Sequence, residues 1–170
     1  MEAIFKRRSI RKYKDIPVTP EQREKLLRAG MAAPSSENDQ EWQFIEIRAQ
    51  ELKQKVMEMD PYAGALRTAP LCFLLCADKR HVSCPDDIYW VQDLSAAAQN
   101  MLLQAADMEL GGLWMGLDDS IRAGLSELLS LPAYIDPLIL LAFGTPDEEK
   151  KPIDRYLADR VHVDGFTETE

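Results

Sequence analysis

The sequence lacks the short motifs that identify nucleotide-binding loops, zinc peptidases and serine hydrolases: GxxxxGK[ST], GxGxxG, HExxH and GxSxG are all absent. Its only histidines, His81 and His162, lie far apart in the chain. A Ser/His/Asp or Cys/His triad would therefore require the fold to bring distant residues together by coincidence. Paired acids at 86–87, 118–119 and 148–149 fall at expected helix starts or in a charged loop, where capping and solvation explain them. If the protein is an enzyme, we expect a bound cofactor to carry the chemistry.

Cysteines and long apolar runs are also scarce. The three cysteines, an odd number, show no CxxC or Cys/His ligand spacing, so we expect reduced thiols and a cytoplasmic protein. The apolar stretch in MEAIFKRR is too short for a signal peptide. The longest apolar runs, Leu71–Ala77 and Pro137–Phe143, have the length of strands, far below the roughly 20 residues that span a bilayer. We expect no membrane segment.

Positive charge is scarce overall but concentrated at one end. The net charge is −9, yet the first 14 residues hold six of the 20 basic side chains and one acid, a local charge of +5 that leaves −14 for the remainder. This acidic remainder would repel a nucleic acid, so no nucleic-acid partner is expected. The stretch KRRSIRKYK is then either a solvated basic face or a site for one compact anion. If it is helical, Arg7 and Arg11 share a face with Ser9 nearby, a donor set suited to a phosphate.

A second polar cluster is APSSENDQEW, residues 33–42. It has two interpretations. It is an ordinary loop between a helix and a strand, or its Ser35, Ser36 and Asn38 supply donors and acceptors to a planar heterocycle with imide edges or to a polyol chain.

Helix and strand signals do not alternate strictly along the chain, which predicts an α+β fold. Thr19, Pro20 and Gln22 supply an N-cap, a first-turn proline and a capping box for a helix that ends before Pro34. Its expected apolar stripe is Leu26, Leu27 and Met31. The other expected elements are a helix over Met1–Arg8 whose Ile4 and Phe5 face the body, strands over Trp42–Ile47, Pro70–Ala77 and Pro137–Phe143, and helices over Ala49–Met59, Asp86–Leu110 and Asp119–Leu131.

Two further features point to a partner subunit. The helix over Asp86–Leu110, stopped by Gly111-Gly112, is apolar nearly all round in SAAAQNMLLQAA, more than a small chain easily buries alone. The last residues include Val161, Val163 and Phe166, which are too apolar for a free tail. We therefore expect one domain over residues 1–170, with an arm over about 156–170 that packs on another surface.

Four stretches together resemble the nitroreductase family of FMN-dependent oxidoreductases, in the family's order and over almost the full chain. They are RRSIRKY at 7–13, APSSENDQEW at 33–42, SAAAQNMLLQAADMELGGLWMG at 95–116 and LLAFGTPDEEKKPIDRY at 140–156. The resemblance implies a homodimer with a mostly antiparallel or mixed sheet surrounded by helices, a C-terminal tail swapped between subunits, and FMN at the interface.

The resemblance also implies site residues, all of them for the cofactor. Residues that would hold the FMN phosphate and the polar edge of the flavin are Arg7, Arg8, Ser9 and Arg11, with Lys151 and Arg155 closing on the phosphate. Residues that would reach the flavin from the other subunit are Pro34, Ser35, Ser36 and Asn38. Met115 and Gly116 fall where backbone groups approach the flavin ring. The family loop usually has a proline before its tryptophan, whereas this chain has Glu41.

The implied activity is hydride transfer from NADH or NADPH through FMN to a nitroaromatic, quinone or related electron-poor acceptor, by a ping-pong mechanism. Three alternatives remain open at this point: a specialised flavoenzyme of the same fold, such as a dehydrogenase, dehalogenase or flavin-cleaving enzyme; a flavin-binding protein without turnover; and, apart from the resemblance, a basic arm that binds a polyanion. No metal site and no catalytic side chain are expected.

Overall fold

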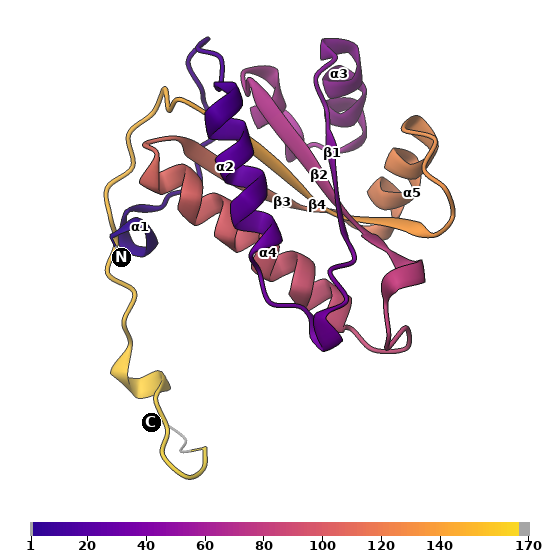
Figure 1. Ribbon diagram of the computed structural model, residues 1–170. Coiled ribbons are helices and arrows are strands. Elements are labelled where there is room, and N and C mark those ends of the chain that lie inside the picture. The colour runs from indigo at the N-terminus through magenta and orange to yellow at the C-terminus, as the bar shows by residue number, and fades with distance from the viewer. Residues whose placement is uncertain (1, 167–170) are drawn as a thin grey trace.

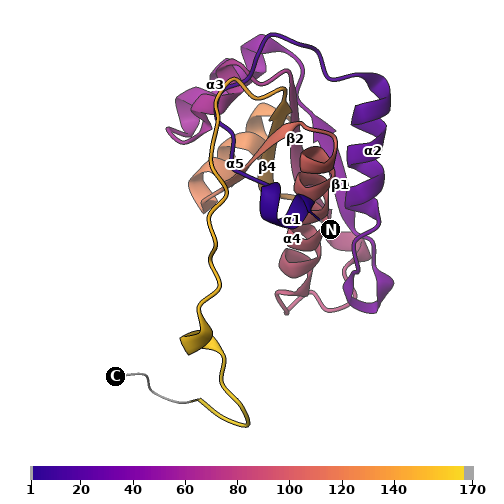
Figure 2. The same cartoon turned by 90° about the vertical axis from the view of Figure 1, so that its left-hand side faces the viewer.

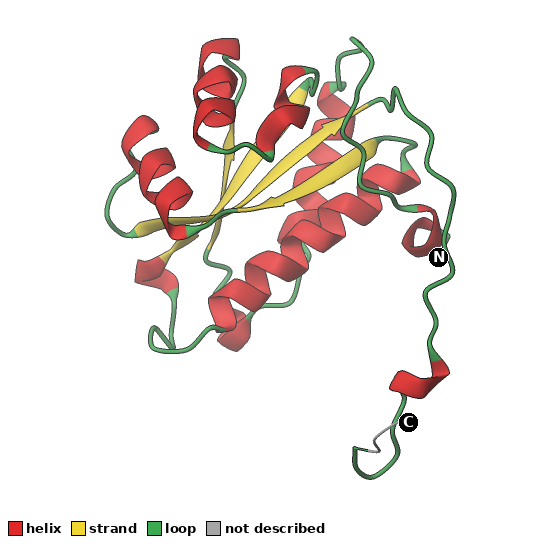
Figure 3. Cartoon of the chain, turned by 180° about the vertical axis from the view of Figure 1, so that it is seen from behind, coloured by secondary structure: helices red, strands yellow, loops and turns green. Residues whose placement is uncertain are grey.

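A four-stranded antiparallel sheet with helices on both faces organises the computed structural model, which describes residues 2–166 (Figures 1 and 3). The strands, in their order across the sheet, are β1 (Trp42–Glu46), β2 (Leu71–Asp78), β4 (Ile135–Gly144) and β3 (Gly111–Gly116). The helices are α1 (Ala3–Lys6), α2 (Pro20–Met31), α3 (Gln50–Met59), α4 (Tyr89–Asp107) and α5 (Asp119–Leu128). This arrangement confirms the predicted α+β class.

Two hydrophobic clusters separate the layers. On one face of the sheet, α2 and α4 pack on Phe73 and Phe143, whose rings meet edge to face with centroids 6.5 Å apart. On the other face, α3 and α5 cover the alternate residues of β2 and β4. Because both faces are covered, every residue of β2 is buried, as the continuous apolar run predicted.

The two amphipathic helices α2 and α5 begin as the sequence predicted. Thr19 Oγ1 accepts from the backbone N–H of Gln22 at 3.2 Å, and Gln22 Oε1 accepts from the N–H of Thr19 at 2.9 Å, which closes the capping box of α2. At α5, the carboxylate of Asp118 accepts from the N–H of Ile121. The predicted stripe of α2 was only partly right, because Leu26 is buried whereas Met31 is 53% exposed.

The helix predicted over Asp86–Leu110 is shorter at both ends, since α4 runs from Tyr89 to Asp107. Met108 is the C-cap of α4, and Glu109 then takes a left-handed conformation with φ 59°. The Gly111-Gly112 pair, predicted to stop this helix, instead begins β3, a strand that the sequence did not predict. A Cβ on Gly112 would come within 2.5 Å of Leu102 Cδ2, so a larger residue there would require the Leu102 side chain of α4 to shift.

The N-terminal helix is also shorter than predicted. α1 covers Ala3–Lys6 and ends at Arg7, whose backbone is extended. Ile4 and Phe5 do not face the body, being 47% and 76% exposed. Arg7 and Arg11 consequently do not share a helical face. The basic segment, residues 6–14, runs as extended chain beyond Lys6.

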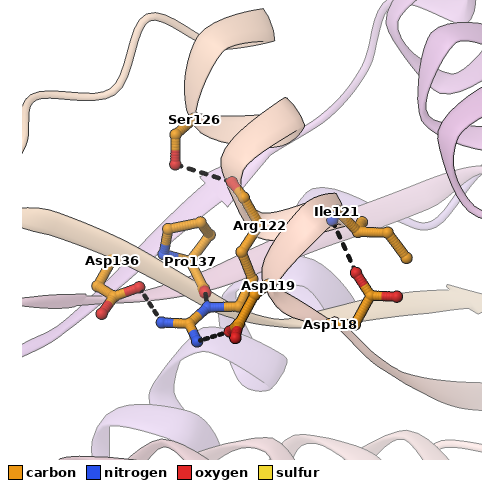
Figure 4. A network of polar contacts seen from close by, with 7 residues as sticks. All are labelled: Asp118, Asp119, Ile121, Arg122, Ser126, Asp136 and Pro137. Carbon is orange, nitrogen blue, oxygen red and sulfur yellow. Dashed lines mark hydrogen bonds and ion pairs between the residues drawn. The ribbon is translucent and has the colours of Figure 1, made fainter.

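One arginine joins α5 to the sheet. Arg122 on α5 donates from Nε to the carbonyl of Pro137 on β4 at 2.8 Å and pairs with Asp119 and Asp136 (Figure 4). Two of the three acceptors, the Pro137 carbonyl and Asp136, lie on β4 and fix the angle of α5 on the strand, whereas Asp119 lies on α5 itself.

Beyond Lys151 the chain leaves the body as an extended arm (Figures 1 and 2). Apolar side chains on the arm are largely exposed in the single chain: Val161 by 62%, Val163 by 80% and Phe166 by 81%. The rest of the predicted arm, residues 167–170, and Met1 of the predicted first helix lie outside the described residues. Within residues 2–166, no helix combines the length and apolarity needed to cross a membrane.

Candidate functional site

The basic segment is built into the edge of the fold. Ser9 forms a parallel bridge to Gly112 at the start of β3, and the N–H of Ile10 donates to the Gly112 carbonyl at 3.0 Å. Farther on, Tyr13 pairs with Pro146, just after β4. The segment is therefore held between edge strand β3 and the stretch that follows β4, which excludes a free cationic arm.

A cleft of about 210 Å³, which we call the basic cleft, opens beside this segment. Its walls come from the basic segment, the C-terminal half of α4, the start of β3 and the stretch after β4, including Arg7, Arg8, Leu102, Gly112 and Lys150. Nη2 of Arg8 is buried here without a hydrogen-bond partner among residues 2–166, while its Nε donates to the carbonyl of Lys151 at 2.8 Å. A buried guanidinium donor with no acceptor in the described chain fits an anionic ligand such as a phosphate, because an unpaired charged donor is costly to bury.

Two residues of the stretch after β4 organise the basic segment and were not predicted as site residues. The Glu148 carboxylate accepts from the backbone N–H groups of Arg11 and Lys12, the latter at 3.3 Å. Lys150 Nζ donates to the carbonyl of Ser9 at 2.6 Å and pairs with Glu148 at 3.3 Å. The bond from the Arg11 N–H, with the charge of Lys150, holds the pKa of Glu148 below its ordinary value. The only sequence feature at these two residues was the mixed charge of DEEKK, residues 147–151, which we interpreted as a polar loop.

The second polar cluster lines a separate cleft. This second cleft, the loop cleft, has a volume of about 440 Å³. Its walls are the N-terminal half of α4 and the loop residues Pro34, Ser35 and Ser36. Asp93 of α4, 8% exposed, accepts from the backbone N–H of Ser36 at 2.9 Å. Asp93 thus fixes the loop to the helix, a contact between residues 57 positions apart that local pattern does not reveal.

This loop has an unusual backbone. Glu37, Asn38 and Gln40 have φ of 49°, 59° and 50°, although none is glycine. Each such conformation costs free energy and persists only where the surroundings impose it. The loop supplies part of the constraint itself: Asn38 Oδ1 accepts from Gln40 Nε2 at 2.8 Å, and Ser35 Oγ accepts from the Gln40 N–H at 3.1 Å. The loop therefore has a specific backbone conformation, which its own side chains help to hold.

Glu41, at the end of the loop, is 1% exposed, and neither carboxylate oxygen has a hydrogen-bond partner in the described part of the chain. Its own carbonyl accepts from the N–H of Asp78, so the backbone is fixed next to β2. Burial raises the pKa of Glu41, and the nearby Asp93 and Asp39 raise it further.

Met115 and Gly116 end strand β3 at the sheet's edge. Met115 is 4% exposed and its side chain belongs to the core, so the side chain is not available to a ligand. A side chain built on Gly116 would meet nothing within 4 Å among the described residues, so the space beside it is open. Lys151 and Arg155 are exposed, and neither lines the basic cleft.

The proposed site residues that line a cleft form two groups at opposite ends of α4: Arg7 and Arg8 in the basic cleft, and Pro34, Ser35 and Ser36 in the loop cleft. The basic cleft includes Ala106, and the loop cleft includes Ala96, ten positions earlier on the helix. At 1.5 Å per residue these positions lie roughly 15 Å apart along the axis. No group of three or more side chains that could hold a metal ion occurs in the described part of the chain.

Comparison with known proteins identifies the family of this chain. The model of the nitroreductase family matches residues 4–62 and 50–145. The chain belongs to the nitroreductase family. A relative from Methanothermobacter thermautotrophicus, provisionally named an NADH dehydrogenase/NAD(P)H nitroreductase, is 37% identical over 98% of this chain and 87% of its own length.

Solved structures of nitroreductase relatives share the fold. A protein from Clostridium acetobutylicum, provisionally named an NADH oxidase, superposes with a TM-score of 0.91 at 40% identity over 96% of this chain and 99% of its own. A provisionally named nitroreductase from Desulfovibrio desulfuricans, solved with FMN, superposes with a TM-score of 0.84 at 32% identity over 98% and 96% of the two chains.

Proposed function

We propose that the protein is an FMN-dependent NAD(P)H oxidoreductase of the nitroreductase type that binds the FMN phosphate in the basic cleft. The observation that carries this assignment is the buried Nη2 of Arg8, unpartnered within residues 2–166, beside a cleft that Arg7 also lines. Family membership and the complex of the Desulfovibrio desulfuricans relative with FMN support the choice of anion. When bound, FMN supplies two-electron chemistry, taking hydride from NADH or NADPH and reducing a nitroaromatic, quinone or related electron-poor acceptor in alternation.

The protein's own residues bind and orient the cofactor. Arg7, Arg8, Ser9 and Arg11 hold the phosphate, and Lys151 and Arg155 close on it from the stretch that precedes the arm. Met115 and Gly116 present backbone groups to the flavin ring, and the open space at Gly116 leaves that approach unobstructed. Backbone groups can stabilise charge on the flavin ring without titrating, so the site requires no catalytic side chain.

We propose that the functional unit is a homodimer in which each chain is one domain over residues 1–170 and its arm, about 156–170, packs on the partner. Pro34, Ser35, Ser36 and Asn38 then reach the flavin held by the other subunit's basic cleft. The separation of the two residue groups at opposite ends of α4 supports this arrangement, as does the exposed apolar arm. Three free cysteines support a cytoplasmic location.

Flavin content tests the assignment. We expect the purified protein, or protein mixed with FMN and desalted, to show an oxidised-flavin spectrum that anaerobic NADH or NADPH bleaches. Charge reversal by Arg7→Glu together with Arg11→Glu is expected to abolish FMN retention with the fold intact by circular dichroism. A colourless protein that takes up no added FMN contradicts the proposal. Retained flavin that NAD(P)H does not bleach indicates a flavin-binding protein without turnover.

A further inference from the structure

The stretch after β4 and the basic segment form a closed network of side chains and backbone. Glu148 receives two backbone N–H groups of the segment, from Arg11 and Lys12, and Lys150 donates to its Ser9 carbonyl while pairing with Glu148. The Lys12 carbonyl in turn accepts from the N–H of Asp147 at 2.9 Å. Residues more than 130 positions apart in sequence thus define the path of the chain through the cleft.

From this network we propose that Glu148 and Lys150 are positioning residues for the FMN phosphate, an inference that rests on the proposed function. They shape the backbone of residues 9–12, and this backbone in turn aims the phosphate-binding side chains.

The backbone at Arg11 and Lys12 has few other constraints. Its neighbours are held by the bridge from Ser9 to Gly112, the bridge from Tyr13 to Pro146 and the bond from the N–H of Tyr13 to Thr68, but within residues 2–166 no helix or strand includes Arg11 or Lys12. Their N–H groups would lose their acceptor without Glu148. Because a hydrogen bond to an ionised acceptor is about twice as strong as a neutral one, Glu148 is the strongest restraint on this part of the segment.

The negative charge of Glu148 distinguishes a positioning role from an electrostatic role by the sign of the change in FMN affinity. A carboxylate beside a phosphate site repels the dianion, so on charge alone its removal should tighten FMN binding. If the acceptor role dominates, removal should weaken binding instead. The two effects have opposite signs, which makes the sign of the change decisive.

Glu149 offers a matched control, because it carries the same charge one residue away and also lines the basic cleft, whereas the contacts that fix the basic segment come from Glu148. Removal of the Glu149 charge should act on the phosphate by charge alone, so we expect Glu149→Gln to tighten FMN binding. Glu148→Ala should weaken FMN binding roughly tenfold or more, the equivalent of one or two charge-assisted hydrogen bonds. Glu148→Gln keeps an acceptor oxygen and should fall between wild type and Glu148→Ala. Lys150→Met should weaken FMN binding in the same direction.

The experiment measures dissociation constants for FMN and for riboflavin, which lacks the phosphate, by flavin fluorescence on the full-length apoprotein. A positioning role predicts that Glu148→Ala weakens FMN binding while riboflavin binding changes by less than about twofold, since riboflavin makes no phosphate contact. Thermal melting of each apoprotein identifies a variant that fails to fold, in which case Glu148→Gln carries the test.

Either of two results overturns the inference: FMN affinity in Glu148→Ala that equals or exceeds that of wild type, or a parallel loss for FMN and riboflavin. If wild type itself binds no FMN, the proposed function is wrong. If wild type binds FMN but Glu148→Ala binds it equally well, only the positioning role is wrong.

Discussion

Glu41 places a carboxylate in the core that accepts no hydrogen bond from residues 2–166, next to Asp93 and Asp39 and with Lys79 as a nearby positive charge. Since burial raises the pKa of Glu41 above its ordinary 4.5, the folded state binds this proton more tightly than the unfolded state. The unfolding free energy therefore falls as pH rises from the ordinary value through the raised pKa. At neutral pH Glu41 destabilises the fold.

We predict that Glu41→Gln raises the unfolding free energy at pH 7 by on the order of 1 kcal/mol, because a neutral buried amide costs less than a buried carboxylate. The gain should shrink as pH falls from the raised pKa toward about 4.5, and it should be lost at lower pH, where wild-type Glu41 is protonated in both states. Urea denaturation from pH 4 to pH 8 measures the difference. Exposed Glu37 is the control, and Glu37→Gln should change the unfolding free energy little at any pH. A constant offset between wild type and Glu41→Gln across the range would contradict the argument.

The three cysteines differ sharply in their surroundings. Burial raises the pKa of Cys72 and of Cys76 to about 12 each, whereas Cys84 is only half-buried in a loop. Because the thiolate is the reactive form, we predict that a disulfide reagent at pH 8 modifies one thiol quickly in the native protein and three in guanidinium. Cys84→Ser should remove the native reaction. Rapid modification of a second native thiol would show that the sheet opens at β2.

The candidate site was predictable from sequence where side-chain chemistry is local, and less so where contacts are distant. Guanidinium and hydroxyl groups in RRSIRKY indicate an anion by type alone. Glu148 and Asp93 show no such signal, because they act on backbone groups 136 and 57 positions away that only the folded chain brings near.

At the scale of elements, the same distinction separates α2 from β3. The capping box of α2 joins residues three apart and was predicted directly from the sequence. Strand β3 begins with two glycines and exists because it pairs along its whole length with β4, about 30 residues later. Glycines weaken local strand preference, so tertiary pairing and the close approach of α4 decide the outcome.

We predict that the Arg122 network fixes α5 to the sheet with measurable energy. Arg122 has a side chain 24% exposed and three partners, so Arg122→Met should lower the unfolding free energy of the apoprotein by about 1–3 kcal/mol. Arg28 is the control: its pair with Glu24 is 76% and 60% exposed, and Arg28→Met should cost below about 0.5 kcal/mol. Equal losses in the two variants, measured by urea denaturation, would show that the network in Figure 4 adds nothing beyond a surface ion pair.

At the scale of the whole molecule, the single chain leaves two features incomplete. Arg7 and Arg8 line one cleft and Pro34, Ser35 and Ser36 line another at the opposite end of α4, and the arm carries largely exposed apolar side chains. Exposed aromatic and branched side chains on an extended arm favour burial against a partner surface. A second copy that received the arm and supplied the loop to the basic cleft would resolve both features. The sequence predicted the apolar arm from composition, but its path depends on a surface outside the chain.

We predict that the arm links dimerisation to cofactor retention. The purified protein should elute with twice the 19.3 kDa mass of the chain by light scattering. Val163→Ser combined with Phe166→Ser removes two apolar side chains of the arm that are 80% and 81% exposed. In the proposed dimer both subunits contribute to each flavin site, so the double substitution should shift the population toward monomer and lower the FMN content together. Tyr62→Ser is the control, since Tyr62 is 84% exposed but lies outside the arm, and it should leave both quantities unchanged. A monomeric wild type that retains FMN would refute the shared site, and a dimer unaffected by the double substitution would refute the role of the arm.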